Sequence, residues 1–286
     1  MMTMKHVADK LTLNNGYQIP CVGYGTYQTP PEEAYAVTKT ALELGYRHVD
    51  TAAFYQNEEG VGQAIRESGI PREEIFVTTK VWNDDRGYDK TIASVRKSLA
   101  TMGLDYIDLV LIHWPANYRQ FGTEAAKINA DTWRALEDLC HEGCVKAIGL
   151  SNFLAHHIEK LLETAEIKPQ VDQIEFHPGW LQAGVVRYCQ DNDILVQAWS
   201  PMGRSDALSN ETIVSVAQKY GKSPTQLCIR WVMQHGVLPL PKSVTAERIR
   251  ENMEVFDFEI SEEDMKTLDN LDLIGGQCAR PDDVDF

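Results

Sequence analysis

Hydrophobic and polar positions along the chain follow one recurring pattern. A short apolar or β-branched run ends in a polar or aromatic residue, and a loop and an amphipathic helix come after it. Strands that alternate with helices in this way predict parallel βαβ units. The clearest runs are HVDTA (48–52), IFVTTKVW (75–82), IDLVLIHW (107–114), VKAIGLSN (145–152), VDQIEFH (171–177), ILVQAWS (194–200) and VLPLPKS (237–243).

The N-terminal part of the chain adds an eighth run and a hairpin. The run lies around Val22–Thr26, before a predicted helix over Pro31–Leu44 that begins with proline and acidic residues and stops at Gly45. Upstream, LTLNNGYQIP (11–20) alternates polar and apolar residues around Asn15-Gly16, which predicts a hairpin with a type I′ turn.

Eight such units predict a closed (β/α)₈ TIM barrel with an N-terminal hairpin, and 286 residues are enough for the roughly 250 that this fold needs. No linker rich in Pro, Gly or Ser divides the chain, so we expect residues 1–286 to form a single domain. A Rossmann sheet would need GxGxxG, but Gly23-Tyr24-Gly25 lacks the third glycine. A P-loop ending at Gly221-Lys222-Ser223 would need a glycine where Val216 stands.

Composition narrows the class of protein further. The net charge of −15 disfavours a nucleic-acid footprint, which relies on clustered Lys and Arg, and the acidic stretch 257–286 fits a solvated helix and tail. No run approaches the roughly 18 apolar residues of a membrane span, and the start, MMTMKHVADK, lacks the apolar core of a secretory signal. The six cysteines form no CxxC pair, so we expect reduced thiols in a cytoplasmic protein.

Polar groups gather where the predicted strands end, which is where TIM barrels carry their chemistry. Taken singly, each has a simpler explanation: an Asp or Lys there is usually solvated, and His113 before Trp114-Pro115 fits a core histidine. The conjunction favours a site, because Tyr55 also lies in the loop five residues beyond Asp50. The strand-end residues are Asp50, Lys80, His113, Ser151, Asn152, Gln173, Trp199, Lys242 and Ser243.

Asp50, Tyr55, Lys80 and His113 together make a proton donor for a carbonyl oxygen. A phenol has a pKa near 10, and we expect a nearby lysine ammonium to lower it. A carboxylate would hold the lysine charged, and a histidine would orient the substrate oxygen. The sequence shows neither HExxH nor a cysteine cluster for a metal, so we expect none. A proton donor alone reduces nothing, so a hydride source must bind nearby.

Five long motifs resemble those of the aldo/keto reductases: GYRHVDTAAFYQNEEGVGQAI (45–65), TTKVW (78–82), DLVLIHWP (108–115), GLSNF (149–153) and LPKSVTAERIREN (240–252). The resemblance runs from LTLNNGYQIP to VFDFEIS, nearly the whole chain. It implies a TIM barrel that binds NADP(H) without a Rossmann fold, and it favours a monomer.

The resemblance also implies roles for matching positions. Tyr55 matches the catalytic acid, Lys80 and Asp50 its tuning pair, and His113 the substrate-orienting histidine. Cofactor positions fall at Gly25 and Thr26 on the first strand, at Ser151, Asn152 and Gln173 for the nicotinamide carboxamide, at Trp199 (often Tyr in the family) for the nicotinamide ring, at Ser200, Pro201, Met202 and Gly203 along the pyrophosphate, and at Lys242, Ser243, Val244, Thr245, Arg248, Glu251 and Asn252 for the 2′-phosphate and adenine. Tyr27, Trp82 and Trp114 match aromatic residues of the substrate pocket, although each also suits a core.

The loops that shape substrate binding in the family are compact here: NYRQFGTEAAKI (117–128), a short loop after Gly203, and about a dozen residues after Leu273. The plan looks most like microbial members that reduce 2,5-diketo-D-gluconate, glyoxals and other small carbonyls. We expect an NADPH-dependent carbonyl reductase. The alternative is an NADPH-binding regulatory or interaction subunit with little turnover.

Overall fold

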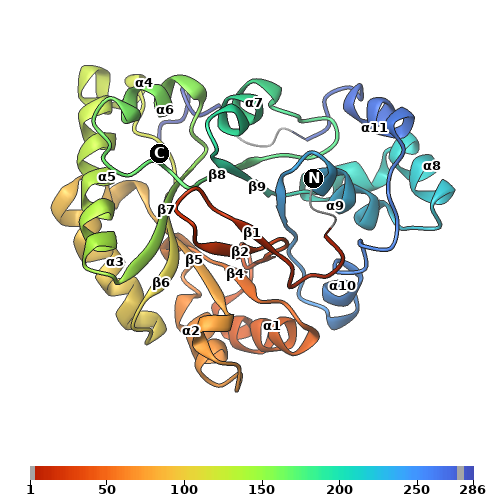
Figure 1. The fold of residues 1–286 in the computed structure, drawn as a ribbon, viewed down its shortest axis with the longest axis horizontal. Helices are drawn as coiled ribbons and strands as arrows, with labels where there is room; N and C mark the ends of the chain where they lie inside the picture. Colours follow the sequence, from red (N-terminus) through yellow and green to blue (C-terminus); the bar gives the residue numbers. More distant parts are fainter. Residues whose placement is uncertain (1–3, 276–279) are drawn as a thin grey trace.

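Eight parallel strands form one sheet in the order β10-β9-β8-β7-β6-β5-β4-β3 in the computed structural model, which describes residues 4–275 and 280–286. Helices surround the sheet, and a two-stranded antiparallel hairpin, β1-β2, lies across one end (Figure 1). The predicted barrel with its N-terminal hairpin is therefore confirmed.

The elements follow the predicted alternation. The strands are β1 (Lys10–Thr12), β2 (Gln18–Pro20), β3 (Tyr24–Gly25), β4 (His48–Asp50), β5 (Phe76–Val81), β6 (Ile107–Ile112), β7 (Val145–Ser151), β8 (Val171–Glu175), β9 (Leu195–Trp199) and β10 (Leu238–Leu240). The α-helices are α1 (Pro31–Leu44), α2 (Glu58–Arg66), α3 (Tyr88–Met102), α4 (Tyr118–Phe121), α5 (Ala125–His141), α6 (Ala155–Leu162), α7 (Ala183–Asp191), α8 (Glu211–Lys219), α9 (Pro224–Gln234), α10 (Ala246–Glu251) and α11 (Glu262–Asp269). Short 3₁₀ helices are η1 (Ala53–Tyr55), η2 (Arg72–Glu74), η3 (Asn83–Asp85), η4 (Gly122–Glu124) and η5 (Gly203–Ser209). Across the described ranges, none of these helices is both long and apolar enough to cross a membrane.

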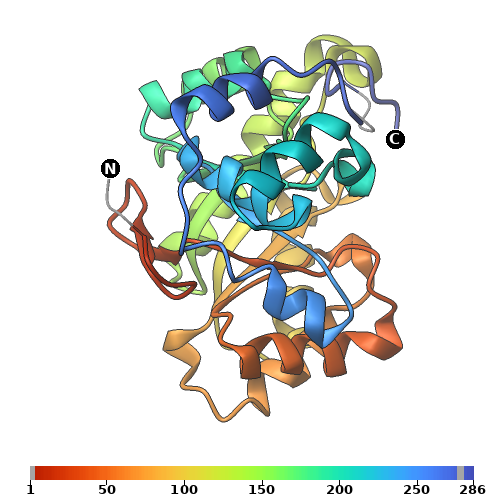
Figure 2. The ribbon, with the colours of Figure 1, turned by 90° about the vertical axis from the view of Figure 1, so that its right-hand side faces the viewer.

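The barrel closes between its first and last strands. The amides of Gly23 and Gly25 donate to the carbonyl oxygens of Pro239 and Pro241, both at 3.0 Å. A Cβ on Gly23 would lie 2.4 Å from the Leu240 side chain, so this seam requires glycine there. Helix α10 lies beside α1 on the outside of the same seam (Figure 2).

Side chains of the strands supply two apolar layers, because successive residues point to opposite faces. Outward residues such as Val49, Val110 and Ile148 pack under the helices. Inward residues such as Leu109 and Leu238 fill the end of the barrel that the hairpin covers, where Leu13 and Ile19 join them. That end is therefore plugged, and only the opposite end is left for a site.

The hairpin turn differs from the prediction. The amide of Gly16 donates to the Leu13 carbonyl oxygen at 2.8 Å, and Gly16 alone has a left-handed φ, +83°. A type I′ turn needs positive φ at both central residues, but Asn15 is not left-handed. The loop is a three-residue connection with a left-handed glycine at its end, so the hairpin is confirmed and its turn type was wrong.

Helix α1 shows why the local sequence predicts its ends. Pro31 occupies the first turn, where a missing amide hydrogen costs nothing, and Glu32 and Glu33 face the positive end of the helix dipole. Gly45 ends the helix with a left-handed φ of +116° and donates its amide to the Leu42 carbonyl oxygen. The predicted bounds agree with the structure.

Candidate active site

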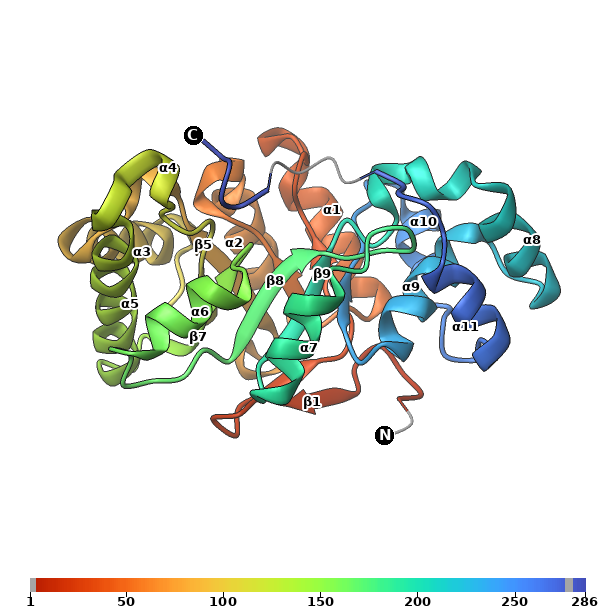
Figure 3. The ribbon, with the colours of Figure 1, turned by 90° about the horizontal axis from the view of Figure 1, so that it is seen from above.

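A cavity of about 1200 Å³ opens at the carboxyl ends of the strands. Figure 3 shows the hairpin and the C-terminal end of the chain at opposite ends of the barrel. Most of the residues predicted from the sequence line this cavity: Gly25, Tyr27, Asp50, Tyr55, Trp82, His113, Trp114, Ser151, Asn152, Gln173, Trp199, Ser200, Pro201, Met202, Lys242, Ser243, Val244, Arg248, Glu251 and Asn252.

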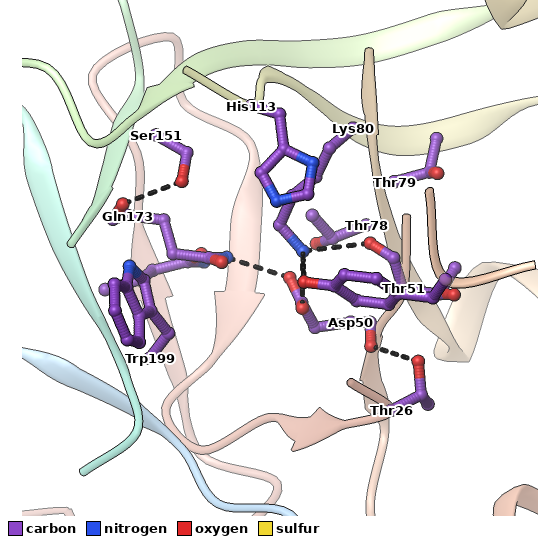
Figure 4. Close-up of polar contacts among 12 residues, drawn as sticks. Thr26, Asp50, Thr51, Thr78, Thr79, Lys80, His113, Ser151, Gln173 and Trp199 are labelled. Carbon is purple, nitrogen blue, oxygen red and sulfur yellow. Dashed lines mark hydrogen bonds and ion pairs between the residues drawn. The ribbon is translucent and has the colours of Figure 1, made fainter. Parts of the chain in front are cut away.

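Lys80 lies behind the cavity wall and connects three groups. Its ammonium donates to Asp50 Oδ1 at 2.7 Å and to the Thr51 carbonyl oxygen at 2.9 Å (Figure 4). It also donates to Tyr55 Oη at 3.3 Å. All three protons of the ammonium are therefore used. The side chains of Lys80 and Asp50 are almost fully buried, so this ion pair is shielded from solvent.

Burial decides the protonation of the groups around the lysine. The pKa of the Tyr55 phenol is raised well above its usual value, first by burial and then by the Asp50 carboxylate. The lowering expected from Lys80 is therefore not the net effect, because burial of the phenol, and after it the Asp50 carboxylate, raise the pKa. Burial, with the charges of Lys80 and Arg86, holds the pKa of His113 well below its usual value. At neutral pH the phenol is protonated and the imidazole is neutral.

His113 lies beside Tyr55, with ring centroids 5.8 Å apart and ring planes at 75°. Its Nδ1 is buried and has no hydrogen-bond partner in the described part of the chain. Arg86 donates to the carbonyl oxygens of Trp114 and Pro115, which fixes the segment that follows His113. The phenol and the neutral imidazole thus meet at one point of the cavity.

A cluster of amides forms the adjoining wall. Gln173 Nε2 donates to Asp50 Oδ2 at 2.8 Å and to Gln197 Oε1 at 2.9 Å. Asn152, held at a left-handed φ of +62°, donates to the His113 carbonyl oxygen and accepts from the indole of Trp199 at 3.0 Å. Because both amide hydrogens of Gln173 are used, its side-chain oxygen is the group left to accept from a ligand.

The far side of the cavity carries basic side chains. Lys242 follows β10, and its ammonium donates to the Gln28 carbonyl oxygen at 3.3 Å. Arg248 is an exposed residue of α10 that lines the same cavity. Ser243 Oγ accepts the amide of Thr245 at 3.4 Å. An anion bound at this end of the cavity would contact the cationic side chains of Lys242 and Arg248 and the residues that follow β10.

Three residues expected at the cofactor do not line the cavity: Thr26, Gly203 and Thr245. Thr26 is buried, and both its hydroxyl and its amide donate to the Asp50 carbonyl oxygen, at 2.9 and 3.0 Å. Gly203 is also buried, and a Cβ there would lie 3.1 Å from the His177 ring. The structure therefore gives Thr26 and Gly203 supporting positions behind the cavity wall.

The structure adds residues that sequence reasoning missed, among them Phe54, Arg204 and Phe286. Phe54 stacks on Trp82 with centroids 3.8 Å apart, and Phe286 lies parallel to Trp82 at 6.1 Å. The carbonyl oxygen of Phe286 accepts from Gln120 at 2.8 Å. Phe54 lies in the motif at residues 45–65, directly before Tyr55, so the sequence could have indicated it. No motif in the sequence indicated Phe286.

Residues 280–286 run to the mouth of the cavity and are tied down along their length. Asn117 Nδ2 donates to the carbonyl oxygens of Pro281 and Val284, both at 2.9 Å. Of the loop expected after Leu273, residues 276–279 lie outside the described residues. The described part adds the aromatic ring of Phe286 to the pocket, so this segment lines more of the pocket than its short length suggests.

His156, His157 and Asp282 form a cluster of possible metal ligands. Both imidazole Nε2 atoms lie 3.0 Å from Asp282 Oδ1. Nδ1 of His157 accepts the amide of Leu154, so the proton of the neutral ring is on Nε2 and faces the carboxylate. A metal needs the Nε2 lone pair, and this geometry instead favours a hydrogen bond that fastens Asp282 to α6.

Comparison with known proteins agrees with this geometry. A family model described as the aldo/keto reductase family matches residues 21–273. The chain is 47% identical over 279 residues to the glyoxal reductase of Bacillus subtilis (strain 168), which covers 97% of this chain and 98% of that protein. The chain belongs to the aldo/keto reductase family.

Solved structures of aldo/keto reductases superpose on the chain. MGS-M4, an aldo-keto reductase from a Medee basin deep-sea metagenome library, is 45% identical with a TM-score of 0.90, over 96% of this chain and all of that one. A variant of Gox0644 in complex with NADPH is 37% identical with a TM-score of 0.89, over 97% and 99%. This aldo/keto reductase is therefore an NADP-dependent oxidoreductase that acts on carbonyl groups, and the predicted family and cofactor are confirmed.

Proposed function

We propose that this aldo/keto reductase reduces small aldehydes and ketones to alcohols, with Tyr55 as the proton donor. The observation that carries the proposal is the buried chain of contacts from Asp50 through Lys80 to the phenol, beside a neutral His113. Bound NADPH supplies the hydride that adds to the carbonyl carbon. All other parts of the reaction fall to side chains of this protein.

In this proposal His113 donates a hydrogen bond to the carbonyl oxygen and holds it against the phenol. As the carbon is reduced, the oxygen becomes alkoxide-like and more basic than a phenolate. Tyr55 therefore gives up its proton even though its pKa is raised. The Lys80 ammonium, 3.3 Å from Tyr55 Oη, stabilises the phenolate that remains, and Asp50 holds the ammonium in place.

The cavity fits the cofactor at both ends. The free oxygen of Gln173, together with Ser151 and Asn152, suits a carboxamide, and Trp199 offers a flat indole beside it. Lys242 and Arg248 suit a phosphate at the other end. We assign the carboxamide to the first group and the adenosine 2′-phosphate to the second, with Ser243, Val244, Glu251 and Asn252 completing the adenosine site.

Lys242→Met and Arg248→Ala should each raise the Kd for NADPH about tenfold or more, because a charge-assisted hydrogen bond contributes about 1.5–3 kcal/mol. NADH lacks the 2′-phosphate, so its Kd should hardly change. Titration of each variant with both cofactors, followed by tryptophan fluorescence, measures the effect. Equal weakening of both would mean that these residues support the fold or bind the adenine and do not bind the phosphate.

The substrate pocket favours compact and aromatic carbonyls. Phe54, Trp82, Trp114 and Phe286 surround it with flat rings, and Tyr27 packs against Tyr55 with centroids 5.1 Å apart. We expect kcat/KM to be higher for methylglyoxal and a nitrobenzaldehyde than for a ketosteroid, because the flat aromatic rings that line the pocket suit a small or planar carbonyl. Steady-state kinetics with the three carbonyls decides this, and a preference for the steroid would contradict the proposal.

An NADPH-oxidation screen over aldehydes, α-dicarbonyls, keto sugars such as 2,5-diketo-D-gluconate, and bulky ketones tests the proposed function. An NADPH-binding regulatory subunit would bind the cofactor without consuming it. The intact set of Asp50, Tyr55, Lys80 and His113 favours turnover. We further propose that the chain acts as a single-domain monomer in the cytoplasm.

A further inference from the structure

Tyr55 lies in a short segment that is not paired with the barrel sheet. Strand β4 ends at Asp50 and α2 begins at Glu58, and the residues between them include the 3₁₀ turn η1. Phe54 and Gln56, on either side of Tyr55, are exposed, and Gln56 has a left-handed φ of +58°. The sheet alone therefore does not fix the position of the phenol.

Asn57 joins the two ends of this segment. Its side-chain oxygen accepts the hydroxyl of Thr51 at 2.7 Å, and its amide donates to the carbonyl oxygens of Thr26 and Thr29 at 3.0 and 3.3 Å. Asn57 is 1% exposed and Thr51 is fully buried, so these hydrogen bonds are shielded from water. Both amide hydrogens of Asn57 are used. The hydrogen bond to Thr51 closes the segment that carries the phenol into a loop.

Thr51 connects this loop to the buried lysine. Its carbonyl oxygen accepts from Lys80 Nζ at 2.9 Å, while its hydroxyl donates to Asn57. Lys80 also donates to Tyr55 Oη at 3.3 Å. The segment therefore contacts one ammonium at both Thr51 and Tyr55, and the Asn57 side chain holds the residues between these two contacts.

The hydrogen bonds of Asn57 are not the usual ones for its place in the chain. Asn57 is the N-cap residue of α2, a position where an asparagine side chain commonly accepts an amide of the first helical turn. Across residues 4–275 and 280–286, its side chain forms no such capping hydrogen bond. The side chain thus stabilises the tyrosine loop in place of the helix end.

We propose that Asn57 is a positioning residue for Tyr55, which sets the place of the phenol relative to Lys80 and the carbonyl oxygen of the substrate. The inference rests on the proposed function, in which Tyr55 donates the proton. A displacement of about 1 Å at a reacting group can lower a rate about 10²-fold. Among the described residues that line the cavity Asn57 is absent, so it acts through the loop and not on the substrate.

Thr51→Val removes the hydrogen bond to Asn57 in nearly the same volume and keeps the Thr51 carbonyl oxygen for Lys80. We expect the single-turnover rate of carbonyl reduction to fall about tenfold to 10²-fold, while the Kd for NADPH stays the same. Thr51→Ser retains the hydroxyl and should lose less. Asn57→Ala removes all three hydrogen bonds and should lower the rate at least as much as Thr51→Val.

Thr29→Val is the matched control. The Thr29 hydroxyl is buried close to Asn57, but it has no hydrogen-bond partner in the described ranges of the chain. The same chemical change is therefore made in the same region without breaking a hydrogen bond. We expect the rate to stay near that of the unchanged protein.

Thr51→Val in the Tyr55→Phe background separates positioning from a general loss of structure. Without the phenol hydroxyl there is no proton donor to position, so the second substitution should not lower the residual rate further, because residues that act as one unit have non-additive effects. Stopped-flow measurement of NADPH oxidation with a saturating reactive aldehyde gives the rates. Titration with NADPH gives the Kd.

An unchanged rate in Thr51→Val would overturn the role of Asn57, and this variant alone decides if Asn57→Ala does not fold. An equal loss in Thr29→Val, or the same fold loss in the Tyr55→Phe background, would also overturn it, because the effect would then not pass through the phenol. A raised Kd for NADPH that accounts for the loss would do the same. Near-normal turnover of Tyr55→Phe by itself is a separate result, which would contradict the proposed function.

Discussion

Tyr55→Phe is expected to lower kcat for carbonyl reduction by about 10² or more, the usual contribution of a positioned general acid. The ring and its packing against Tyr27 and His113 remain, so the fold and the Kd for NADPH should stay near their values in the unchanged protein. Steady-state rates with a reactive aldehyde, together with cofactor titration, measure both. Near-normal turnover would rule Tyr55 out as the acid.

Tyr27→Phe is the matched control. Its phenol lines the same cavity and lies against the Tyr55 ring, but within the described part of the chain it forms no hydrogen bond with Lys80. We expect its kcat to change by no more than a few-fold. A loss as large as that of Tyr55→Phe would mean that the cavity needs its hydroxyl groups for packing or hydration, and would remove the distinction between them.

Lys80→Met should also suppress turnover by a large factor, because the phenolate left after proton transfer loses its only cationic neighbour among the described residues that contact it. The variant also leaves the Asp50 carboxylate, which is 4% exposed, without its cationic partner. Removing one partner of a buried ion pair costs about 3–5 kcal/mol, so the melting temperature should fall as well. Activity and thermal unfolding are therefore measured together.

The double variant Asp50→Asn with Lys80→Met separates the two effects. Both charges are gone, so no charge is left buried alone, and we expect most of the lost stability to return. The rate should stay low, because nothing then stabilises the phenolate. Recovery of the rate along with the stability would show that Lys80 only balances Asp50 and does not act on Tyr55.

The barrel and much of the site could be predicted because strand periodicity places strand ends at one face of the molecule. That rule indicated Asp50, Lys80 and His113. Tyr55 was indicated because it lies five residues after Asp50 in the sequence. Arg204 and Phe286 were not found. Each sits in an irregular segment, and its position depends on packing against residues far along the chain, such as His177 beneath the loop and Gln120 beside the tail.

The pKa of Tyr55, the direction of the Thr26 side chain and the type of the hairpin turn were harder to predict than the fold. The direction of the Tyr55 pKa was wrong because it depends on how deeply the phenol is buried and on the Asp50 charge, and neither can be read from spacing. Thr26 was expected at the cofactor, but its side chain turns inward to the Asp50 backbone. The type of the hairpin turn was wrong for a similar reason, because one residue of loop length changes the required backbone angles.

The hairpin that plugs the barrel has a consequence for the time course of synthesis. It is made before the barrel, yet Asn15 hydrogen-bonds Lys146, and Asn14 hydrogen-bonds Pro169 and Asp193, which lie 131, 155 and 179 residues later. At about 5–20 residues per second, roughly 7 to 36 seconds pass before these partners are synthesised. During that interval Leu13 and Ile19 have no barrel to cover them. The hairpin therefore docks long after it is made, and a chaperone has an apolar target there until it does.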